Sequence, residues 1–202
     1  MLIRAFVGVY WGARQDSLEC CAKRLKAHFI SLSHASDKLS QWMNLGRSSK
    51  RNYINIGLDD EIVALLKRGE NKGEFDKKAI PELGYRVALW NGRENSFSAQ
   101  TMVKCGLQAK VAGLSNAASV SISFDEWRSG DFDSERTMEE LVSIWDAESG
   151  IVRFTMNNSS ESDEYIDLDY INYVKDGFKK PKVSGDWEKV KGGWLAKTSI
   201  KF

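Results

Sequence analysis

The side chains that most often act as general bases or metal ligands are scarce in this chain of 202 residues. Its two histidines, His28 and His34, are six residues apart, a spacing that does not place them on one face of a helix. Of the three cysteines, Cys20 and Cys21 are adjacent and Cys105 stands alone, without the spacing of a metal site. We therefore expect packed histidines and reduced, largely buried thiols. Neither a metal nor a cofactor is predicted.

Sequence motifs of known catalytic chemistry are also missing. The chain has no phosphate-cradling glycine-rich loop, no GxSxG nucleophile elbow and no HExxH metal motif. The three acids at residues 59–61 are typical of a helix N-terminus, where the helix dipole favours negative charge. The Asn91-Gly92 pair is a hairpin signal, and it is followed by Arg93. These observations predict a protein that binds a macromolecule without catalysis, although acids assembled only in space leave no such pattern.

The formal net charge of +1 hides an uneven distribution of charge along the chain. Residues 1–124 carry 18 Lys and Arg against 11 Asp and Glu, residues 125–169 carry 3 against 14, and residues 170–202 carry 8 against 3. The middle segment, called here the acidic block, therefore has a net charge of −11 between two basic segments. If the block forms one surface, that surface attracts a basic partner and repels nucleic acid. Charge runs are also typical of solvated faces that bind nothing.

The acidic block supplies the residues that we predict to contact a partner. They are Glu139, Glu140, Glu161, Asp163, Glu164, Tyr165, Asp167 and Asp169. Asn91 and Arg93, in the turn described above, are secondary candidates. Direct binding of nucleic acid needs a basic face with aromatic or polar readers, and the lysines after residue 174 are equally typical of a solvated loop. No direct contact with nucleic acid is predicted.

Apolar periodicity predicts a helical cluster in the first third of the chain and strands beyond it. The first part should contain a strand at 2–11, a helix opened by a capping box of Asp16 and Glu19, a short helix with Leu39, Trp42 and Met43 that ends near Gly46, and a helix capped by Asp59 or Asp60. The second part should contain strands at 85–90, 97–105, 118–124, 151–156 and 194–202, and a helix opened by a capping box of Thr137 and Glu140. Residues 165–174 fit neither the helical nor the strand period cleanly.

This order of elements predicts an α+β fold. A helical cluster followed by strands favours a mainly antiparallel sheet with the N-terminal helices and one further helix packed on it, because the regular βαβ alternation of a doubly wound fold is absent. With only two prolines and no long linker, residues 1–202 are expected to form a single domain.

The apolar run at residues 5–11 bears on where the protein resides. It is shorter than the roughly 20 residues that span a bilayer, and it lacks the cationic start and cleavage site of a secretory signal. No later run is long enough to cross a membrane, and an odd number of cysteines fits a reducing compartment. We expect a cytoplasmic protein without a membrane contact.

Several short stretches, in this order, resemble one family. They are Tyr10-Trp11-Gly12-Ala13-Arg14 with Asp16-Ser17, Trp42 with Gly46-Arg47-Ser48, Ile80-Pro81-Glu82-Leu83-Gly84-Tyr85, Leu89-Trp90-Asn91-Gly92, Lys104-Cys105-Gly106, Asn116, Trp145-Asp146 and Gly193-Trp194-Leu195. Each is weak alone, but their order and spacing from residue 10 to residue 195 resemble the immunity protein 52 family of bacterial polymorphic-toxin systems. The chain departs from the family pattern at Ala13 and at residues 147–150, where the family often has proline, and both departures concern turns.

The resemblance implies a cytoplasmic antitoxin, encoded beside a toxin that it binds and neutralises. The partner implied is a cognate nuclease toxin with a restriction-endonuclease-like fold, often delivered by a type VI secretion system. The resemblance carries no catalytic residues over to this chain. Its aromatic motif residues are expected to pack at strand ends beside glycines, or to act as anchors if they are exposed around a groove; they are Tyr10, Trp11, Trp90 and Trp194.

A physical hypothesis for inhibition follows from the charge of the acidic block. A nuclease carries a basic surface for phosphates, so an inhibitor can place carboxylates where the phosphates would lie. Tyr165 and Tyr170 would add anchoring contacts beside them. Inhibition at a distance from the toxin's active site is an open alternative. The competing function from another class is a small metal-dependent hydrolase or nuclease with a spatially assembled acidic site, and a third is a nucleic-acid-binding module.

Overall fold

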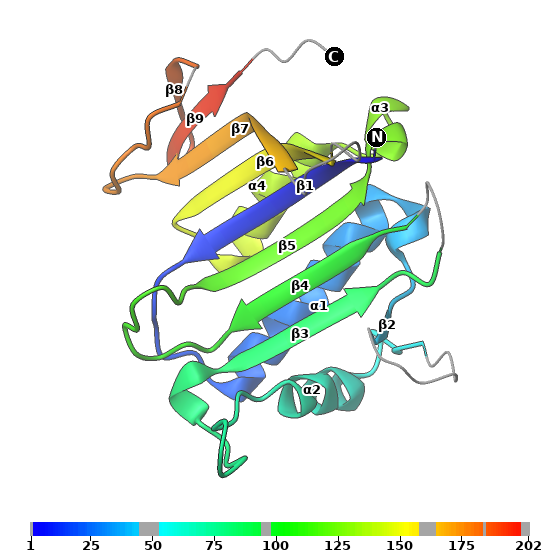
Figure 1. Cartoon of the computed structure of the whole chain (residues 1–202), viewed down its shortest axis with the longest axis vertical. Helices are drawn as coiled ribbons and strands as arrows, with labels where there is room; N and C mark the ends of the chain where they lie inside the picture. Colours follow the sequence, from blue (N-terminus) through cyan, green and yellow to red (C-terminus); the bar gives the residue numbers. More distant parts are fainter. Residues whose placement is uncertain (1, 45–52, 94–97, 158–164, 184, 199–202) are drawn as a thin grey trace.

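The computed structural model of the chain describes residues 2–44, 53–93, 98–157, 165–183 and 185–198, with the backbone alone at residues 2, 3, 156, 157 and 165–168. Within these residues nine strands form one sheet in the order β2-β3-β4-β5-β1-β6-β7-β9-β8, and every neighbouring pair is antiparallel. Figure 1 shows β1, which opens the chain, at the centre of this sheet. The strands are β1 (Leu2–Trp11), β2 (Met43–Asn44), β3 (Tyr85–Trp90), β4 (Gln100–Cys105), β5 (Asn116–Ser123), β6 (Ser149–Asn157), β7 (Tyr165–Lys175), β8 (Trp187–Val190) and β9 (Gly193–Lys197).

The helices gather on one side of the sheet. They are α1 (Leu18–Ala35), α2 (Asp59–Arg68), α3 (Phe124–Arg128) and α4 (Ser134–Trp145), with short 3-10 turns η1 (Asp37–Leu39) and η2 (Pro81–Leu83). Figure 1 shows α1 and α4 behind the sheet and α2 beside its β3 end, so no described helix covers the face turned toward the viewer. We call this the open face. The predicted α+β fold with a mainly antiparallel sheet is confirmed.

Alternation along β1 separates the two faces. Val7 and Val9 are buried against the helices and pair with buried residues of β5, whereas Phe6 and Tyr10 are half-buried on the open face. Side chains of neighbouring strand residues point to opposite faces, so a strand with one buried and one half-exposed row is expected at the centre of a sheet covered on one side. The hydrophobic core therefore lies between β1 and its neighbours and the helical layer.

A buried polar chain connects the helical layer to the sheet. The indole Nε1–H of Trp145 donates to Nδ1 of His28 at 3.3 Å, and Nε2 of His28 lies 2.9 Å from Oγ1 of Thr101. The Thr101 hydroxyl donates onward to the carbonyl of Ser119 at 2.7 Å. Because the acceptor and donor at the two ends are fixed, His28 must be the neutral tautomer with its proton on Nε2. The expectation of a packed histidine is confirmed for His28, which is fully buried, whereas His34 is exposed.

The caps of three helices differ from the prediction. Ser17, not Asp16, caps α1 by accepting from the amide of Cys20, because the Asp16 carboxylate is held by Arg14 at 2.6 Å. Asp133 caps α4 in place of the predicted box of Thr137 and Glu140, whose Thr137 hydroxyl donates back to the Asp133 carbonyl.

The N-terminus of α2 has no side-chain cap, since Leu58 occupies the position predicted for Asp59 or Asp60. The apolar sequence around it nevertheless predicted the helix itself, whose buried residues are Ile62, Leu65 and Leu66. Three acids in its first turn still complement the helix dipole.

The short helix predicted around Leu39, Trp42 and Met43 is wrong. Only η1 is helical there, and Met43 instead pairs with Trp90 as part of β2. The backbone of Met43 pairs with the edge of β3 that faces away from β4. This pairing between distant segments overrides the local helical pattern. Gly46, the predicted end of that helix, lies outside the described residues.

The segment with no clear period, residues 165–174, is a strand interrupted by a bulge. Val152 pairs with Ile171 while Arg153 pairs with Asp169, which leaves Tyr170 as the extra residue. A bulge reverses the alternation of side chains, so apolar residues on both sides of it do not keep a single period of two. The sequence had not predicted β8 or α3.

The buried histidine generates a prediction for stability against pH. Burial lowers the pKa of His28 from 6.5 to about 3, so the unfolded chain binds a proton below pH 6.5 that the folded chain rejects. The free energy of unfolding should fall by about 2 kcal/mol between pH 7 and pH 5 from this residue. Urea unfolding of the wild type and of His28→Gln at both pH values measures it. The variant should be less stable at pH 7 but should lose this pH dependence.

His34 provides the matched control. It is exposed near the end of the same helix, so His34→Gln should keep the pH dependence of the wild type. Equal pH dependence in the wild type and His28→Gln would contradict a neutral buried His28.

Candidate functional site

Helix α4 presents the first two predicted contact residues on its outer side. Met138, Leu141 and Trp145 face the core at helical spacing, which turns Glu139 outward to solvent. The neighbouring Glu140 is half-buried: it accepts from the Ser31 hydroxyl at 2.6 Å and pairs with Arg136 at 3.0 Å. Glu140 therefore binds α1 to α4, whereas Glu139 makes no ion pair in the described part of the chain.

A groove runs between α4 and the last strands of the sheet. Its volume is about 540 Å³, and Glu139 lies on its wall. The other residues lining it are Met138, Val142, Ser143, Asp146, Ala147, Tyr173, Lys175, Val190, Lys191, Gly192 and Leu195. More than half of the lining residues are apolar, aromatic or glycine, and a groove with such a lining can accept an anchoring side chain. Sequence patterns did not reveal this groove, because it joins a helix to strands 30 or more residues later.

Asp169 lies on the other side of the sheet. It pairs in register with Arg153 of β6, and the two side chains form an ion pair at 2.7 Å. Val152 and Phe154 on either side of Arg153 are buried in the core under the helices, so Arg153 and Asp169 belong to the open face. The structure therefore does not place Asp169 beside Glu139 and Glu140.

The remaining predicted contact residues are only partly described. Glu161, Asp163 and Glu164 lie outside the described residues. Tyr165 and Asp167 are in β7, opposite Asn157 and Thr155, and only their backbone is described. Their role as contact residues stays a prediction.

Ion pairs with other segments neutralise part of the acidic block. Asp146 pairs with Lys175 at 2.6 Å, and Glu135 pairs with Lys197 at 2.7 Å. Both lysines come from the basic C-terminal segment, so charges that are separate in sequence meet in the fold. The negative charge left to attract a partner is correspondingly smaller than −11, and among the described residues it is concentrated around α3 and α4, where Asp125 and Glu139 are exposed.

The secondary candidates Asn91 and Arg93 occupy different environments. Asn91 is buried, and its side-chain oxygen accepts from the amides of Ala99 at 2.9 Å and Arg93 at 3.3 Å. Its amide nitrogen donates to the carbonyl of Lys38 at 3.2 Å. Asn91 thus closes the connection from β3 to β4, and Arg93 is the exposed residue of the pair.

The open face carries aromatic residues that the charge pattern could not indicate. A side chain at Gly8 would meet the ring of Phe6 and the hydroxyl of Tyr10 at 3.0 Å or less, so both side chains lean over this glycine. At the far end of the sheet, Nζ of Lys180 lies 3.1 Å from the ring centre of Trp194. Of the aromatic motif residues, Trp11 is buried, and Tyr10, Trp90 and Trp194 are half-buried. The expectation of packing at strand ends is therefore met fully by Trp11 and partly by the others.

Groups that bind metals do not converge in the described ranges: no cluster of three or more His, Cys, Asp or Glu side chains occurs there. Cys21 and Cys105 are buried and Cys20 is half-buried, all as free thiols. The pKa of the Cys105 thiol is raised by its hydrogen bond with Cys21 and by its burial, so this thiol stays protonated. Within the described residues, no helix is long and apolar enough to cross a membrane.

The contacts of Asn91 generate a prediction that separates its structural role from that of Arg93. Asn91→Ala leaves buried backbone groups without partners, so the free energy of unfolding should fall by about 1–3 kcal/mol. Arg93→Ala removes an exposed side chain and should change it by less than about 0.5 kcal/mol. Urea unfolding of both variants tests this, and equal stability of the two would contradict the assignment of Asn91.

Comparison with known proteins agrees with the resemblance found in the motifs. The family model for Immunity protein 52 matches residues 4–147, which covers β1 through α4 and includes Glu139 and Glu140. No curated protein matches the chain. The match covers well over half of the 202 residues, so the chain belongs to the immunity protein 52 family.

Proposed function

We propose that the chain is a cytoplasmic antitoxin that binds and neutralises a nuclease toxin with a restriction-endonuclease-like fold, delivered by a type VI secretion system. Family membership indicates an antitoxin that binds a cognate toxin as an inhibitor without catalysis. The nuclease activity of the partner, its delivery and the compartment are our proposal. They draw on the motif resemblance and on the charge of the surface described above.

The observation that carries the proposal is the exposed carboxylate of Glu139 on the wall of the groove beside α4. The apolar side chains of the groove supply a place for an anchoring side chain, and the exposed carboxylates of Asp125 and Glu139 on α3 and α4 supply attraction to a basic surface. This part of the molecule lies partly in the matched segment, since that segment ends at residue 147.

A nuclease is the partner that this combination fits best. Its substrate is a chain of phosphates, so its binding surface must be basic. Carboxylates of α3 and α4 then occupy the positions of phosphates, which both accelerates association and excludes the nucleic acid. Glu161, Asp163, Glu164 and Asp167 are proposed to contribute further carboxylates to the contact with the toxin.

Charge reversal tests the electrostatic part of the proposal. Asp125→Lys combined with Glu139→Lys should reduce the association rate with the toxin encoded by the adjoining gene by about tenfold at low salt. The difference should shrink as salt is added, because screening weakens the attraction between exposed charges. A second variant, in which lysine replaces Glu161, Asp163, Glu164 and Asp167, should also reduce the association rate. Stopped-flow fluorescence over a range of salt concentrations provides the measurement.

The control is Asp60→Lys with Glu74→Lys, which changes the net charge equally but on α2 and in the segment after it, away from α4. It should leave the association rate within about twofold of the wild type. Association rates of the α3–α4 variant that equal the control at low salt would contradict electrostatic recognition by this surface.

Cell survival tests the function as a whole. Cells that express the neighbouring toxin should survive and keep intact DNA or RNA when this chain is expressed with it. Intact nucleic acid in unprotected, dying cells would exclude a nuclease partner. Death despite a stable, expressed antitoxin would exclude the antitoxin role for that pair.

A further inference from the structure

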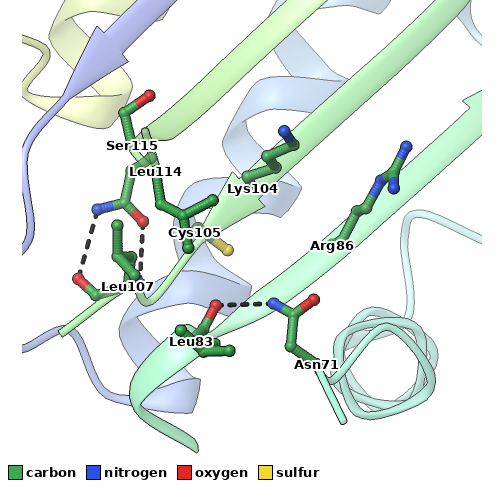
Figure 2. Close-up of a pocket in the computed structure, with 9 residues that line it drawn as sticks. Asn71, Leu83, Arg86, Lys104, Cys105, Leu107, Leu114 and Ser115 are labelled. Carbon is green, nitrogen blue, oxygen red and sulfur yellow. Dashed lines mark hydrogen bonds between the residues drawn. The ribbon is translucent and has the colours of Figure 1, made fainter. Parts of the chain in front are cut away.

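A small pocket lies at one end of the open face, where β3 begins and β4 ends. Its volume is about 220 Å³, and it is lined by Asn71, Leu83, Arg86, Lys104, Cys105, Leu107, Leu114, Ser115 and Asn116. Figure 2 shows Lys104 and Arg86 rising from neighbouring strands above the pocket in this view, with Leu83 and Asn71 below it. Among the described residues, no acidic side chain contributes to the lining.

The two cations of this pocket oppose each other directly. Arg86 and Lys104 are register partners of the antiparallel pair β3–β4, and both are exposed. Like charges in this position repel and weaken the pairing of the strands. The Arg86 guanidinium contacts the sulfur of Met102 at 3.8 Å, and no carboxylate in the described part of the chain pairs with either cation. Many other cations of the fold, by contrast, are held by carboxylates, such as Arg14 by Asp16.

The other polar groups of the pocket are already committed to holding its walls. The Asn71 amide donates to the carbonyls of Leu83 at 2.7 Å and Gly84 at 3.0 Å. The Asn116 oxygen accepts from the amide of Leu107 at 2.9 Å. The walls are therefore fixed before anything binds, and the donors left over for an incoming group are those of Arg86, Lys104 and the Ser115 hydroxyl.

Size and surroundings restrict what enters. The pocket is smaller than the ~300–1,000 Å³ of pockets that enclose whole small molecules, so it suits the end of one side chain. Two apolar side chains of the β4–β5 connection lie exposed near it, Leu114 at 50% and Val111 at 39%. Apolar groups beside a pair of hydrogen-bond donors are typical of contacts between proteins. A nucleic-acid phosphate backbone has no apolar surface against which Leu114 and Val111 could be buried.

We infer that Arg86 and Lys104 form a binding site for a carboxylate side chain of a protein partner, with Leu114 packing beside that side chain. A glutamate or aspartate entering here accepts hydrogen bonds from both cations and removes their mutual repulsion. The inference rests on the proposed function, because the partner meant is the toxin that the chain neutralises. It adds a site of opposite charge to the acidic surface around α4.

Replacement of one cation separates binding from stability. In Lys104→Glu the new carboxylate lies opposite Arg86, so the strands pair better and the variant should unfold at an equal or higher urea concentration than the wild type. Its affinity for the toxin encoded by the adjoining gene should nevertheless fall at least tenfold. The double variant Arg86→Glu with Lys104→Glu should lose more affinity for the toxin than Lys104→Glu alone. Titration calorimetry with the purified toxin domain provides the affinities.

A matched control and a reciprocal exchange complete the test. Lys23→Glu with Lys67→Glu makes the same change of charge on α1 and α2 and should leave the affinity within about twofold. Each acidic surface residue of the toxin is then replaced by lysine in turn, and one such variant should regain affinity for Lys104→Glu but not for the control.

The outcomes distinguish the inference from the proposed function. Failure of the wild type to bind the toxin contradicts the proposed function. Tight binding by the wild type and an unchanged affinity of the double variant contradicts the carboxylate site alone. Retention of inorganic phosphate or of double-stranded DNA by the free wild type, lost in the double variant while toxin binding is kept, assigns the site to a phosphate and overturns the inference.

Discussion

The hydrogen-bonded chain from Trp145 through His28 to Thr101 fixes how the helices sit on the sheet. It connects the end of α4 to α1 and then to β4 and β5, all within the core. The indole of Trp145 also stacks on Trp11 at the end of β1, with ring centres 5.0 Å apart. Because these donors and acceptors are buried, each needs its partner in place, and a shift of either helix would leave at least one unsatisfied. The positions of Glu139 and of the groove beside α4 depend on this junction.

The sheet divides the charges of the molecule in a way that the linear sequence does not. Carboxylates of α3 and α4 lie on the helical side, whereas Arg86, Lys104 and the Arg153–Asp169 pair lie on the open face. Lysines of the last segment return to neutralise acids of the middle segment, so a sum over residues 125–169 overstates the field that a partner meets. A protein with a net charge of +1 thereby offers surfaces of both signs.

How much of the molecule could be predicted depended on whether the determinants were local. Strands β1 and β3 followed from alternation and turn residues, and α1 and α2 from the spacing of apolar residues, because burial imposes those periods directly. Caps were less predictable, since Asp16 had a competing partner in Arg14. The bulge at Tyr170 and the pairing of Met43 with Trp90 required knowledge of the neighbouring strand. The candidate sites were least accessible: the groove and the Arg86–Lys104 pair exist only once distant segments are adjacent.

The central place of β1 has a consequence for the way the protein is made. The first strand of the chain hydrogen-bonds to β5 and β6, more than 100 residues later, so it leaves the ribosome long before either neighbour. At synthesis rates of about 5–20 residues per second, its apolar row waits roughly 5–25 seconds for β5. The sheet closes around β1 only when β6 has also emerged, so the centre of the fold forms after α1, α2, α4 and four further strands have been synthesised.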